Sequence, residues 1–222
     1  MRRDYRAVVF DAVGTLIHAE PAVGRVYAEV GRRHGSGQNG TTIEARFRAA
    51  FRRQESIDRE RNWITSAERE VQRWRDIVAE VFGDEIDGAC FTELYQHFAQ
   101  PGAWRVAASA GNLIRLLRRR GMVVAMASNF DERLHGIVAG LPELKELNAV
   151  IVSSEVGVRK PGRAFFEAIA SRLGIRTGAI VFVGDDPIND GQGAADAGLK
   201  SLLLGREIRE LLDIETMLRE PV

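Results

Sequence analysis

Short apolar runs separated by helical patterns constrain the fold of this chain more than any other feature of its sequence. The runs cover residues 7–10, 122–127, 149–152, 179–183 and 201–204. Each has the length and apolar content of a buried strand. Leucine, isoleucine and phenylalanine recur at helical spacing between the later runs, in residues 112–120 and 164–173. Strands and helices in repeated alternation predict an α/β core with a doubly wound, Rossmann-like parallel sheet.

Residues 17–103 interrupt this alternation. No convincing strand occurs there, and amphipathic helical patterns follow one another, for example in residues 43–51 and 71–82. Thr65-Ser66-Ala67-Glu68 has the form of a capping box at the start of the second of these helices. We therefore expect an all-helical domain at residues 17–103, inserted into a core built from residues 1–16 and 104–222. Such an insert would cover the site at the end of the first strand.

The bulk composition excludes several classes of partner. The chain has 222 residues with 31 basic and 31 acidic side chains, so no net charge favours nucleic acid or a membrane surface. A single cysteine, Cys90, excludes an internal disulfide and favours a reducing compartment. No apolar run approaches the roughly 20 residues of a membrane span, and Asp11 interrupts the apolar start too early for a signal peptide. We expect a soluble, cytoplasmic protein, and its oligomeric state is not encoded in any readable pattern.

Polar residues follow the predicted strands at the points where the strands end. They are Asp11, Ser128 with Asn129, and Asp185 with Asp190, and Lys160 follows the run at 149–152 after a loop. Because the carboxyl ends of parallel strands share one edge of the sheet, we expect these side chains to converge. Taken singly, each signal is weak: a strand-end aspartate is often a cap or turn former, and Ser128-Asn129 could cap a helix near residues 132–138. Asp186 fits two roles equally well, an additional outer metal ligand or part of the turn at Pro187. Lys160 is one of only three lysines, which gives it weight.

The ordered set resembles the haloacid dehalogenase superfamily of hydrolases, in the subfamily with an α-helical cap. The matching motifs are Asp11-Ala12-Val13-Gly14-Thr15 for Asp-x-Asp-x-Thr, Ser128 followed by Asn129, Lys160-Pro161, and the acidic pair Asp185 and Asp190. The resemblance covers nearly the whole chain, and the motifs depart from the family pattern only at Val13. It implies the two-part architecture described above.

The resemblance also implies a chemistry for these residues. Asp11 would attack phosphorus and form an aspartyl-phosphate. Mg²⁺ would bind Asp11, Asp185 and the backbone carbonyl of Val13, with Asp190 behind them orienting water or Lys160. The substrate's phosphoryl oxygens would be held by Ser128, the Asn129 backbone N–H, Lys160 and Thr15. Clustered carboxylates repel a phosphate dianion, so both the metal and the lysine are needed.

Val13 removes the family's proton shuttle, because the family has a second aspartate at this position. General acid–base help is worth roughly 10²–10⁴ in rate. Three alternatives stay open at this point. The substrate has a good leaving group, such as an acyl or aryl phosphate; or His18 or Glu20, in the link to the insert, supplies the proton; or catalysis has been lost.

The expected function is therefore a Mg²⁺-dependent phosphatase acting on a small phosphorylated metabolite. The alternative is a catalytically weak or inactive phosphate-binding or regulatory protein. A 2-haloacid dehalogenase is less favoured, because Asp185 and Asp186 would repel a carboxylate substrate. Within the insert, Arg25 and Arg32 are candidates to reach a second anion of the substrate. Trp63, Trp74 and Trp104 are expected in the core.

Overall fold

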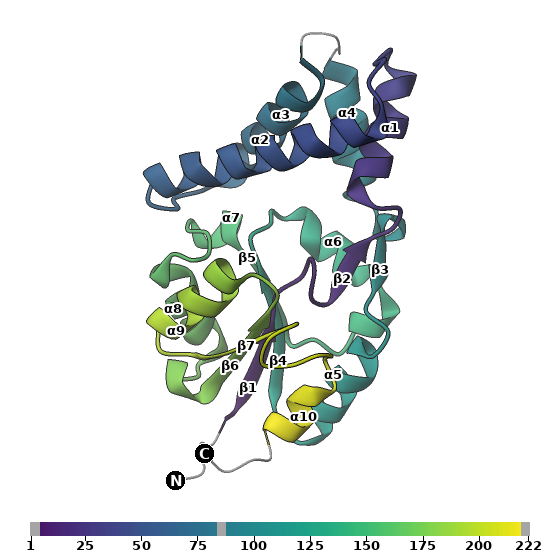
Figure 1. Ribbon diagram of the computed structural model, residues 1–222. Helices are drawn as coiled ribbons and strands as arrows, with labels where there is room; N and C mark the ends of the chain where they lie inside the picture. Colours follow the sequence, from purple (N-terminus) through teal and green to yellow (C-terminus); the bar gives the residue numbers. More distant parts are fainter. Residues whose placement is uncertain (1–4, 84–87, 219–222) are drawn as a thin grey trace.

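The computed structural model describes residues 5–83 and 88–218, and its centre is a parallel sheet (Figure 1). The five strands have the order β5-β4-β1-β6-β7. Their bounds are β1 Ala7–Phe10, β4 Val123–Ser128, β5 Ala149–Val152, β6 Ile180–Gly184 and β7 Lys200–Leu203. β1 lies in the middle, with Ala7 in register with Val123 on one side and Ile180 on the other. The predicted α/β fold with a doubly wound parallel sheet is confirmed.

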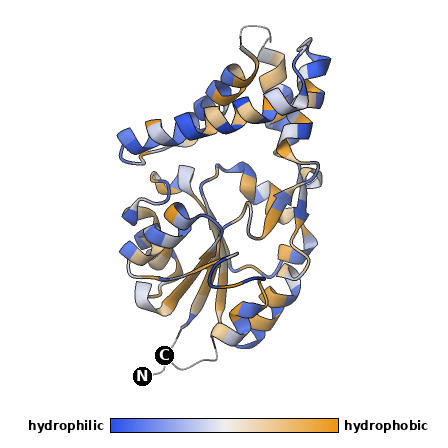
Figure 2. Cartoon of the chain, in the orientation of Figure 1, coloured by the Kyte–Doolittle hydropathy of each residue, from blue (hydrophilic) through white to orange (hydrophobic). Residues whose placement is uncertain are grey.

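Both faces of this sheet are buried, because alternate residues of a strand point to opposite sides. Val8 and Phe10 pack in one apolar cluster with residues of three helices, α5 Ala110–Arg119, α6 Arg133–Ala139 and α10 Asp213–Met217. Ala7 and Val9 pack in a second cluster with α8 Arg163–Leu173 and α9 Gly193–Asp196. The short helix α7 Ser153–Val156 follows β5 directly. Figure 2 shows the strands between these layers as a predominantly hydrophobic part of the chain.

Three of the predicted strands are shifted by one residue. β4 begins at Val123 instead of Met122 and includes Ser128 as its last residue. Gly121, with φ of +76°, makes the turn after α5, and the Met122 N–H still bonds to Leu117 of that helix. The helical turn therefore uses Met122 before the strand can begin. The shift matters for the site, because it puts the Ser128 side chain on the strand itself.

Among the described residues, four α-helices between β2 Ile17–Ala19 and β3 Trp104–Val106 lie over the carboxyl end of the sheet (Figure 1). They are α1 Val23–Arg33, α2 Gly40–Glu60, α3 Ala67–Phe82 and α4 Gly88–His97, and we call them the helical insert. The chain enters the insert through β2 and leaves it through β3, which pair antiparallel. The expectation that residues 17–103 contain no strand is therefore wrong for β2. A run of three residues is too short to show the period of a strand.

The insert has an apolar cluster of its own, in which Tyr27, Ile43, Ile77 and Phe82 are buried. α1 approaches α3 closely at Gly31, where a Cβ atom would lie 2.4 Å from the Phe82 ring. α3 begins one residue later than the predicted capping box. Ser66 is its N-cap and accepts from the Arg69 N–H, whereas the Thr65 hydroxyl donates to Glu70.

The insert also touches the core at the end remote from β2 and β3. The turn between α2 and α3 lies against the loop before Lys160, and Ile64 and Val158 form an isolated antiparallel bridge. The Thr65 N–H donates to the Gly157 carbonyl at 3.0 Å, and the Arg159 N–H donates to the Trp63 carbonyl at 2.9 Å. The insert is thus fastened to the core at two separated places. Within the described residues, no helix is both long and apolar enough to cross a bilayer.

Candidate active site

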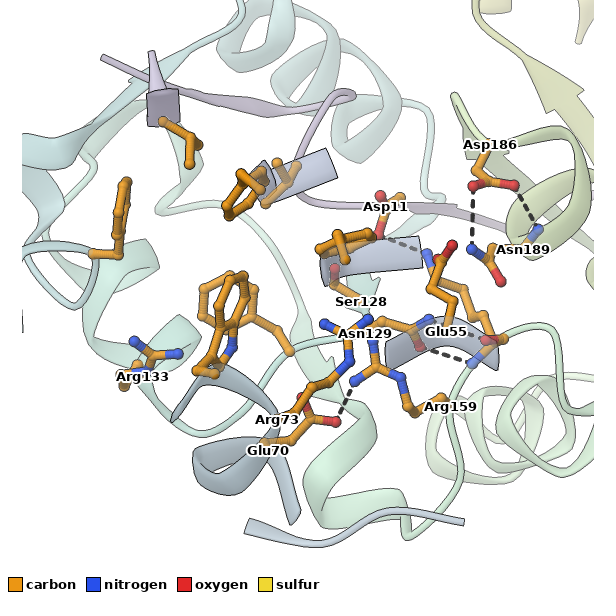
Figure 3. A pocket seen from close by; sticks show the side chains of 18 of the residues that line it. Asp11, Glu55, Glu70, Arg73, Ser128, Asn129, Arg133, Arg159, Asp186 and Asn189 are labelled. Atoms are coloured by element: carbon orange, nitrogen blue, oxygen red, sulfur yellow. Dashed lines mark hydrogen bonds and ion pairs between the residues drawn. The ribbon is translucent and has the colours of Figure 1, made fainter. Parts of the chain in front are cut away.

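The polar groups predicted at the strand ends meet in one cavity of about 310 Å³ between the sheet edge and the insert (Figure 3). Those that line it are Asp11, Val13, Ser128, Asn129, Lys160, Asp185 and Asp190. Thr15 does not line the cavity, and its hydroxyl donates to Asp185 Oδ1 at 3.2 Å. The parallel register of the strands accounts for the convergence, because β1, β4 and β6 all end at this edge.

Lys160 joins two of the carboxylates. Its Nζ lies 2.6 Å from Asp11 Oδ1 and 2.6 Å from Asp190 Oδ1, and the residue is only 2% exposed. Burial disfavours the charged ammonium, but the Asp11 and Asp190 carboxylates outweigh it and raise the pKa of Lys160 above its usual value. The lysine is therefore a fixed positive charge directly beside Asp11.

Asn129 sets the position of Lys160 through the backbone. Its Oδ1 accepts from the Lys160 N–H at 2.7 Å, and its Nδ2 donates to the Lys160 carbonyl at 3.0 Å. This pair of bonds ties the end of β4 to the loop that carries the lysine. The Asn129 side chain is thereby used for structure, which leaves its backbone N–H as the group that could face a substrate.

Asp190 is held just as firmly. Its Oδ2 accepts from the backbone N–H groups of Asp185 at 3.1 Å and Asp186 at 3.0 Å. A Cβ atom on Gly184 would lie 2.1 Å from this oxygen, so only glycine permits the approach. Burial raises the pKa of Asp190, while Lys160 opposes the rise. Asp190 is thus fixed behind the other carboxylates and bonded to the lysine.

Asp11, Asp185 and Asp190 each place a carboxylate oxygen within 4.8 Å of the others. Burial, together with repulsion from Asp190, raises the pKa of Asp185 above its usual value. Gly14, with φ of +91°, lets the chain pass this group, because a Cβ there would lie 2.4 Å from Asp185 Oδ2. Three carboxylates beside a single lysine leave a local excess of negative charge. Hard oxygen ligands in such an arrangement fit a divalent cation such as Mg²⁺.

Asp186 has a structural role in this arrangement. Its carboxylate accepts from the backbone N–H groups of Ile188 and Asn189, each at 2.8 Å, and from the Asn189 side chain at 3.1 Å. These bonds hold the turn at 187–192, a helical turn of the wide i→i+5 type that presents Asp190. Of the two roles that the sequence leaves open for Asp186, the structure shows the turn.

Val13 lines the cavity and is 40% exposed, so an apolar side chain faces the region where a proton donor is missing. Neither His18 nor Glu20 lines the cavity, and Glu20 pairs with Arg105 at 3.7 Å. Of the three alternatives, a proton donor at His18 or Glu20 is therefore not supported, because His18 lies on β2 and Glu20 directly after it, along the connection to the insert. A carboxylate of the insert, Glu55 on α2, does line the cavity.

Glu55 differs from the other cavity carboxylates. The six are Asp11, Glu55, Glu70, Asp185, Asp186 and Asp190. The four aspartates are hydrogen-bonded to neighbouring groups, and Glu70 forms an ion pair with Arg159. Within residues 5–83 and 88–218, the Glu55 carboxylate has neither a hydrogen bond nor an ion pair, and the residue is half-buried. Nothing in the sequence distinguishes it from the other charged residues of α2, because facing a cavity depends on how the insert packs.

The cavity has an aromatic wall, formed by the insert, by β3 and by the segment after β4. It comprises Tyr27, Phe47, Phe51, Trp74, Phe91, Tyr95, Phe98, Trp104 and Phe130. Trp104 lies in the core cluster as expected and Trp74 packs against the cluster of the insert, and both also line this cavity. Trp63 instead belongs to the turn between α2 and α3 and does not line it.

A buried ion network adjoins the aromatic wall. Asp58 Oδ2 on α2 lies 3.0 Å from Arg73 Nε on α3 and 3.5 Å from Arg159 Nε of the core. Arg159 also pairs with Glu70, and both line the cavity together with Arg73. Burial, with repulsion from Arg159, lowers the pKa of Arg73 to about 10, so it stays charged at neutral pH.

The arginines expected to reach the site lie elsewhere. Arg25 and Arg32 border a separate hollow near Ser36 and do not line the cavity that contains Asp11. Arg73 and Arg159 occupy the position that had been expected for them. Sequence reasoning missed both residues: Arg73 is one of many arginines in the insert, and Arg159 was overshadowed by its neighbour Lys160.

Comparison with known proteins agrees with this geometry. The model of the family described as haloacid dehalogenase-like hydrolase matches residues 5–198. The chain is 31% identical over 209 residues to haloacid dehalogenase-like hydrolase domain-containing protein 3 of Mus musculus, covering 91% of this chain and 83% of that protein. Its fold is similar to the magnesium-bound putative HAD-hydrolase YfnB of Bacillus subtilis, with a TM-score of 0.77 at 18% identity over 97% of this chain and 99% of the other. A phosphoserine phosphatase of Thermus thermophilus is 31% identical over 130 residues, which span 56% of this chain and 48% of that enzyme. The chain belongs to the haloacid dehalogenase-like hydrolases.

Proposed function

We propose that this hydrolase is a Mg²⁺-dependent phosphatase that acts on a small phosphorylated metabolite through an aspartyl-phosphate on Asp11. The observation that carries the proposal is the buried Lys160 held at 2.6 Å from Asp11 inside a cluster of three carboxylates. A positive charge and a cation-binding acidic cluster on either side of a strand-end aspartate suit a phosphoryl group. The similarity to a phosphoserine phosphatase supports this class of reaction.

Asp11 would act as the nucleophile through Oδ2, because Lys160 bonds to Oδ1. In the first step, Oδ2 forms a bond to phosphorus, and the bond from phosphorus to the leaving oxygen breaks with its electron pair on that oxygen. In the second step, the oxygen of a water molecule forms a bond to the same phosphorus, and the bond from phosphorus to Asp11 Oδ2 breaks with its electron pair on the carboxylate. Inorganic phosphate leaves with the water oxygen, and the proton of the water passes to the phosphate or to solvent. Lys160, the Ser128 hydroxyl and the Asn129 backbone N–H would bind the phosphoryl oxygens and offset their charge.

Asp11, Asp185 and the Val13 carbonyl would hold Mg²⁺, with Asp190 behind them. When bound, the ion would neutralise the acidic cluster and the phosphoryl charge, which allows a dianion to approach Asp11. We assign Thr15 to positioning Asp185, because its hydroxyl bonds to that carboxylate. The helical insert would act as the family's helical cap, with residues 17–103 as the cap domain on a core of residues 1–16 and 104–222.

The leaving group is constrained by Val13. Without the family's second aspartate, an alkoxide would leave unprotonated, which is slow. We therefore infer that the enzyme favours acyl or aryl phosphates, whose leaving groups are stable anions. Glu55, a cavity carboxylate whose side chain has no partner among the described residues, is the group that we propose to assist less favourable leaving groups.

A substrate panel tests the proposal. Purified protein with Mg²⁺ should hydrolyse acetyl phosphate and p-nitrophenyl phosphate faster than sugar phosphates, and chelation should abolish the reaction. If no compound turns over above the Asp11→Asn background, the protein is a phosphate-binding member of the family and the catalytic proposal fails. Release of halide from a 2-haloacid without Mg²⁺ would instead identify a dehalogenase.

A further inference from the structure

Arg73 has binding capacity that the proposed phosphate chemistry does not use. The residue is 1% exposed and lines the cavity, and its Nε donates to Asp58. Its Nη2 has no hydrogen-bond partner in the part of the chain that the structure describes. A buried donor on a charged group is costly to leave unpaired, so a guanidinium nitrogen in this state at a cavity wall indicates a missing acceptor.

The charges around Arg73 indicate that the missing acceptor is an anion. Three guanidinium groups, from Arg69, Arg73 and Arg159, share the buried carboxylates of Asp58 and Glu70. A third carboxylate, Asp76, is partly exposed and lies 4.0 Å from Arg69, not beside Arg73. Arg73 and Arg159, the two arginines of the network that line the cavity, thus share the Asp58 carboxylate with Arg69, and the Glu55 carboxylate in the same cavity forms no ion pair with either of them. The positive charge of the network is therefore incompletely balanced on its cavity side. A carboxylate or phosphate oxygen would complete it, whereas a cation would be repelled.

Arg73 lies on the aromatic wall of the cavity, so aromatic rings border any ligand that reaches from the Asp11 side of the cavity to Arg73. Its guanidinium carbon lies 4.5 Å from the centre of the Phe51 ring, and Phe51 and Trp74 are 6.4 Å apart, centre to centre. Figure 3 shows Arg73, Glu70 and Arg159 on one side of the cavity and Asp11 and Asp186 toward the other. A ligand that spans these sides runs along aromatic rings, which favours an apolar or aromatic body.

We propose that Arg73 binds a second anionic group of the substrate, so that the enzyme acts on small phosphate monoesters with an apolar, preferably aromatic, body and a carboxylate or further phosphate at the far end. This substrate class rests on the proposed phosphatase function and sharpens it. A volume of about 310 Å³ admits one ring with its two anionic groups. An aryl ester also has a good leaving group, which the reaction needs because Val13 cannot donate a proton.

The test compares phosphate esters that differ only at the far end. Phenyl phosphate, 3- and 4-carboxyphenyl phosphate, 1,4-phenylene bisphosphate and 4-(aminomethyl)phenyl phosphate are assayed with Mg²⁺. We expect kcat/KM for the better carboxylate or bisphosphate to exceed that for phenyl phosphate by about tenfold or more, and the cationic ester to be the poorest. The ratio of carboxylate to bisphosphate identifies the preferred anion. An aliphatic phosphate ester with a terminal carboxylate at equal kcat/KM would overturn the aromatic part of the proposal.

Variants separate binding from structure. Arg73→Gln should reduce the advantage of the anionic esters to about one while leaving phenyl phosphate within about threefold of the wild-type value, and Arg73→Lys should restore part of it. Arg69→Gln is the matched control, because Arg69 bonds the same Asp58 at 2.7 Å but does not line the cavity. An equal loss of the advantage in Arg69→Gln, or an advantage unchanged in Arg73→Gln, would overturn the proposal.

Binding to the Asp11→Asn protein distinguishes this inference from the proposed function. Calorimetry with 4-carboxyphenyl phosphate and phenyl phosphate needs no turnover. A difference in Kd that disappears in Asp11→Asn/Arg73→Gln upholds the anion site even if the wild type hydrolyses nothing. If aryl phosphates are hydrolysed but Arg73→Gln does not change the difference between 4-carboxyphenyl phosphate and phenyl phosphate, the phosphatase function is supported and the proposed anion site is refuted.

Discussion

The edge of the sheet and the inner face of the helical insert border the same cavity but are built differently. At the sheet edge, Lys160, Asp185, Asp186 and Asp190 all have bonded partners that fix their geometry. On the insert side the wall is mostly aromatic, Arg73 has an unpaired nitrogen, and Glu55 has no partner among the described residues. The fixed side suits a reaction common to many members of a family, and the open side suits selection of a particular substrate.

The largest effect should come from breaking the fixed side at its centre. Asp11→Asn removes the proposed nucleophile and should lower p-nitrophenyl phosphate turnover by roughly 10⁴-fold or more. Asp196→Asn, an exposed aspartate on α9, serves as the control and should keep full activity. Substantial turnover by Asp11→Asn would assign the nucleophile to another group.

A smaller effect is expected when the acidic cluster is reduced. Asp185→Asn should raise the Mg²⁺ concentration needed for half-maximal activity by about a hundredfold. The same change relieves the repulsion of Asp185 by the buried Asp11 and Asp190 carboxylates, so without Mg²⁺ the variant should unfold at the same temperature as the wild type or a higher one. Mg²⁺ titrations of the rate and thermal unfolding in a chelator measure the two effects. An unchanged Mg²⁺ requirement would contradict the ligand assignment.

Val13→Asp sharpens the comparison by restoring a proton donor to the fixed side. It should raise turnover of alkyl phosphates by about tenfold to a hundredfold and that of aryl phosphates less, because a phenolate leaves without protonation and gains only from activation of the attacking water. Val13→Asn has nearly the same shape without the acid and should not reproduce the gain. A gain in both variants would point to a change in packing and not to proton transfer.

The smallest effect tests the open side. Glu55→Gln should lower the residual turnover of alkyl phosphates by about tenfold or less and leave p-nitrophenyl phosphate within about twofold. Glu60→Gln, an exposed glutamate at the end of the same helix, is the control. Equal losses on both substrates in Glu55→Gln would mean that Glu55 shapes the cavity without exchanging a proton.

The sequence was sufficient to predict the core and the residues that would meet at the sheet edge. Apolar runs show where strands end, and parallel strands end at the same edge of a sheet. Asp11, Ser128, Lys160 and Asp185 could therefore be placed near one another from the sequence alone. Their proposed roles in catalysis stay predictions. The strand β2 was missed because three residues show no period.

The insert side could not be predicted in the same way. Periodicity shows that Trp74 and Phe51 lie on apolar faces of their helices, but the angle at which the helices pack decides whether such a face meets the core or a cavity. For the same reason, Arg73 and Glu55 could not be told from other charged residues, and the wrong arginines, Arg25 and Arg32, were chosen. Long-range pairings such as Arg159 with Glu70 leave no local pattern in the sequence.

The second attachment of the insert, through Ile64 and Val158 and through Arg159 with Asp58 and Glu70, limits how freely the insert can be exchanged between relatives. A chimera that replaced this insert with one lacking carboxylates at those two positions would leave Arg159 charged and unpaired in the interior, next to Lys160, at a cost of about 3–5 kcal/mol. The loop that carries Lys160 therefore depends on contacts that this particular insert provides. Residues 157–160 and the insert would have to be transferred together, as one unit of inheritance or of engineering.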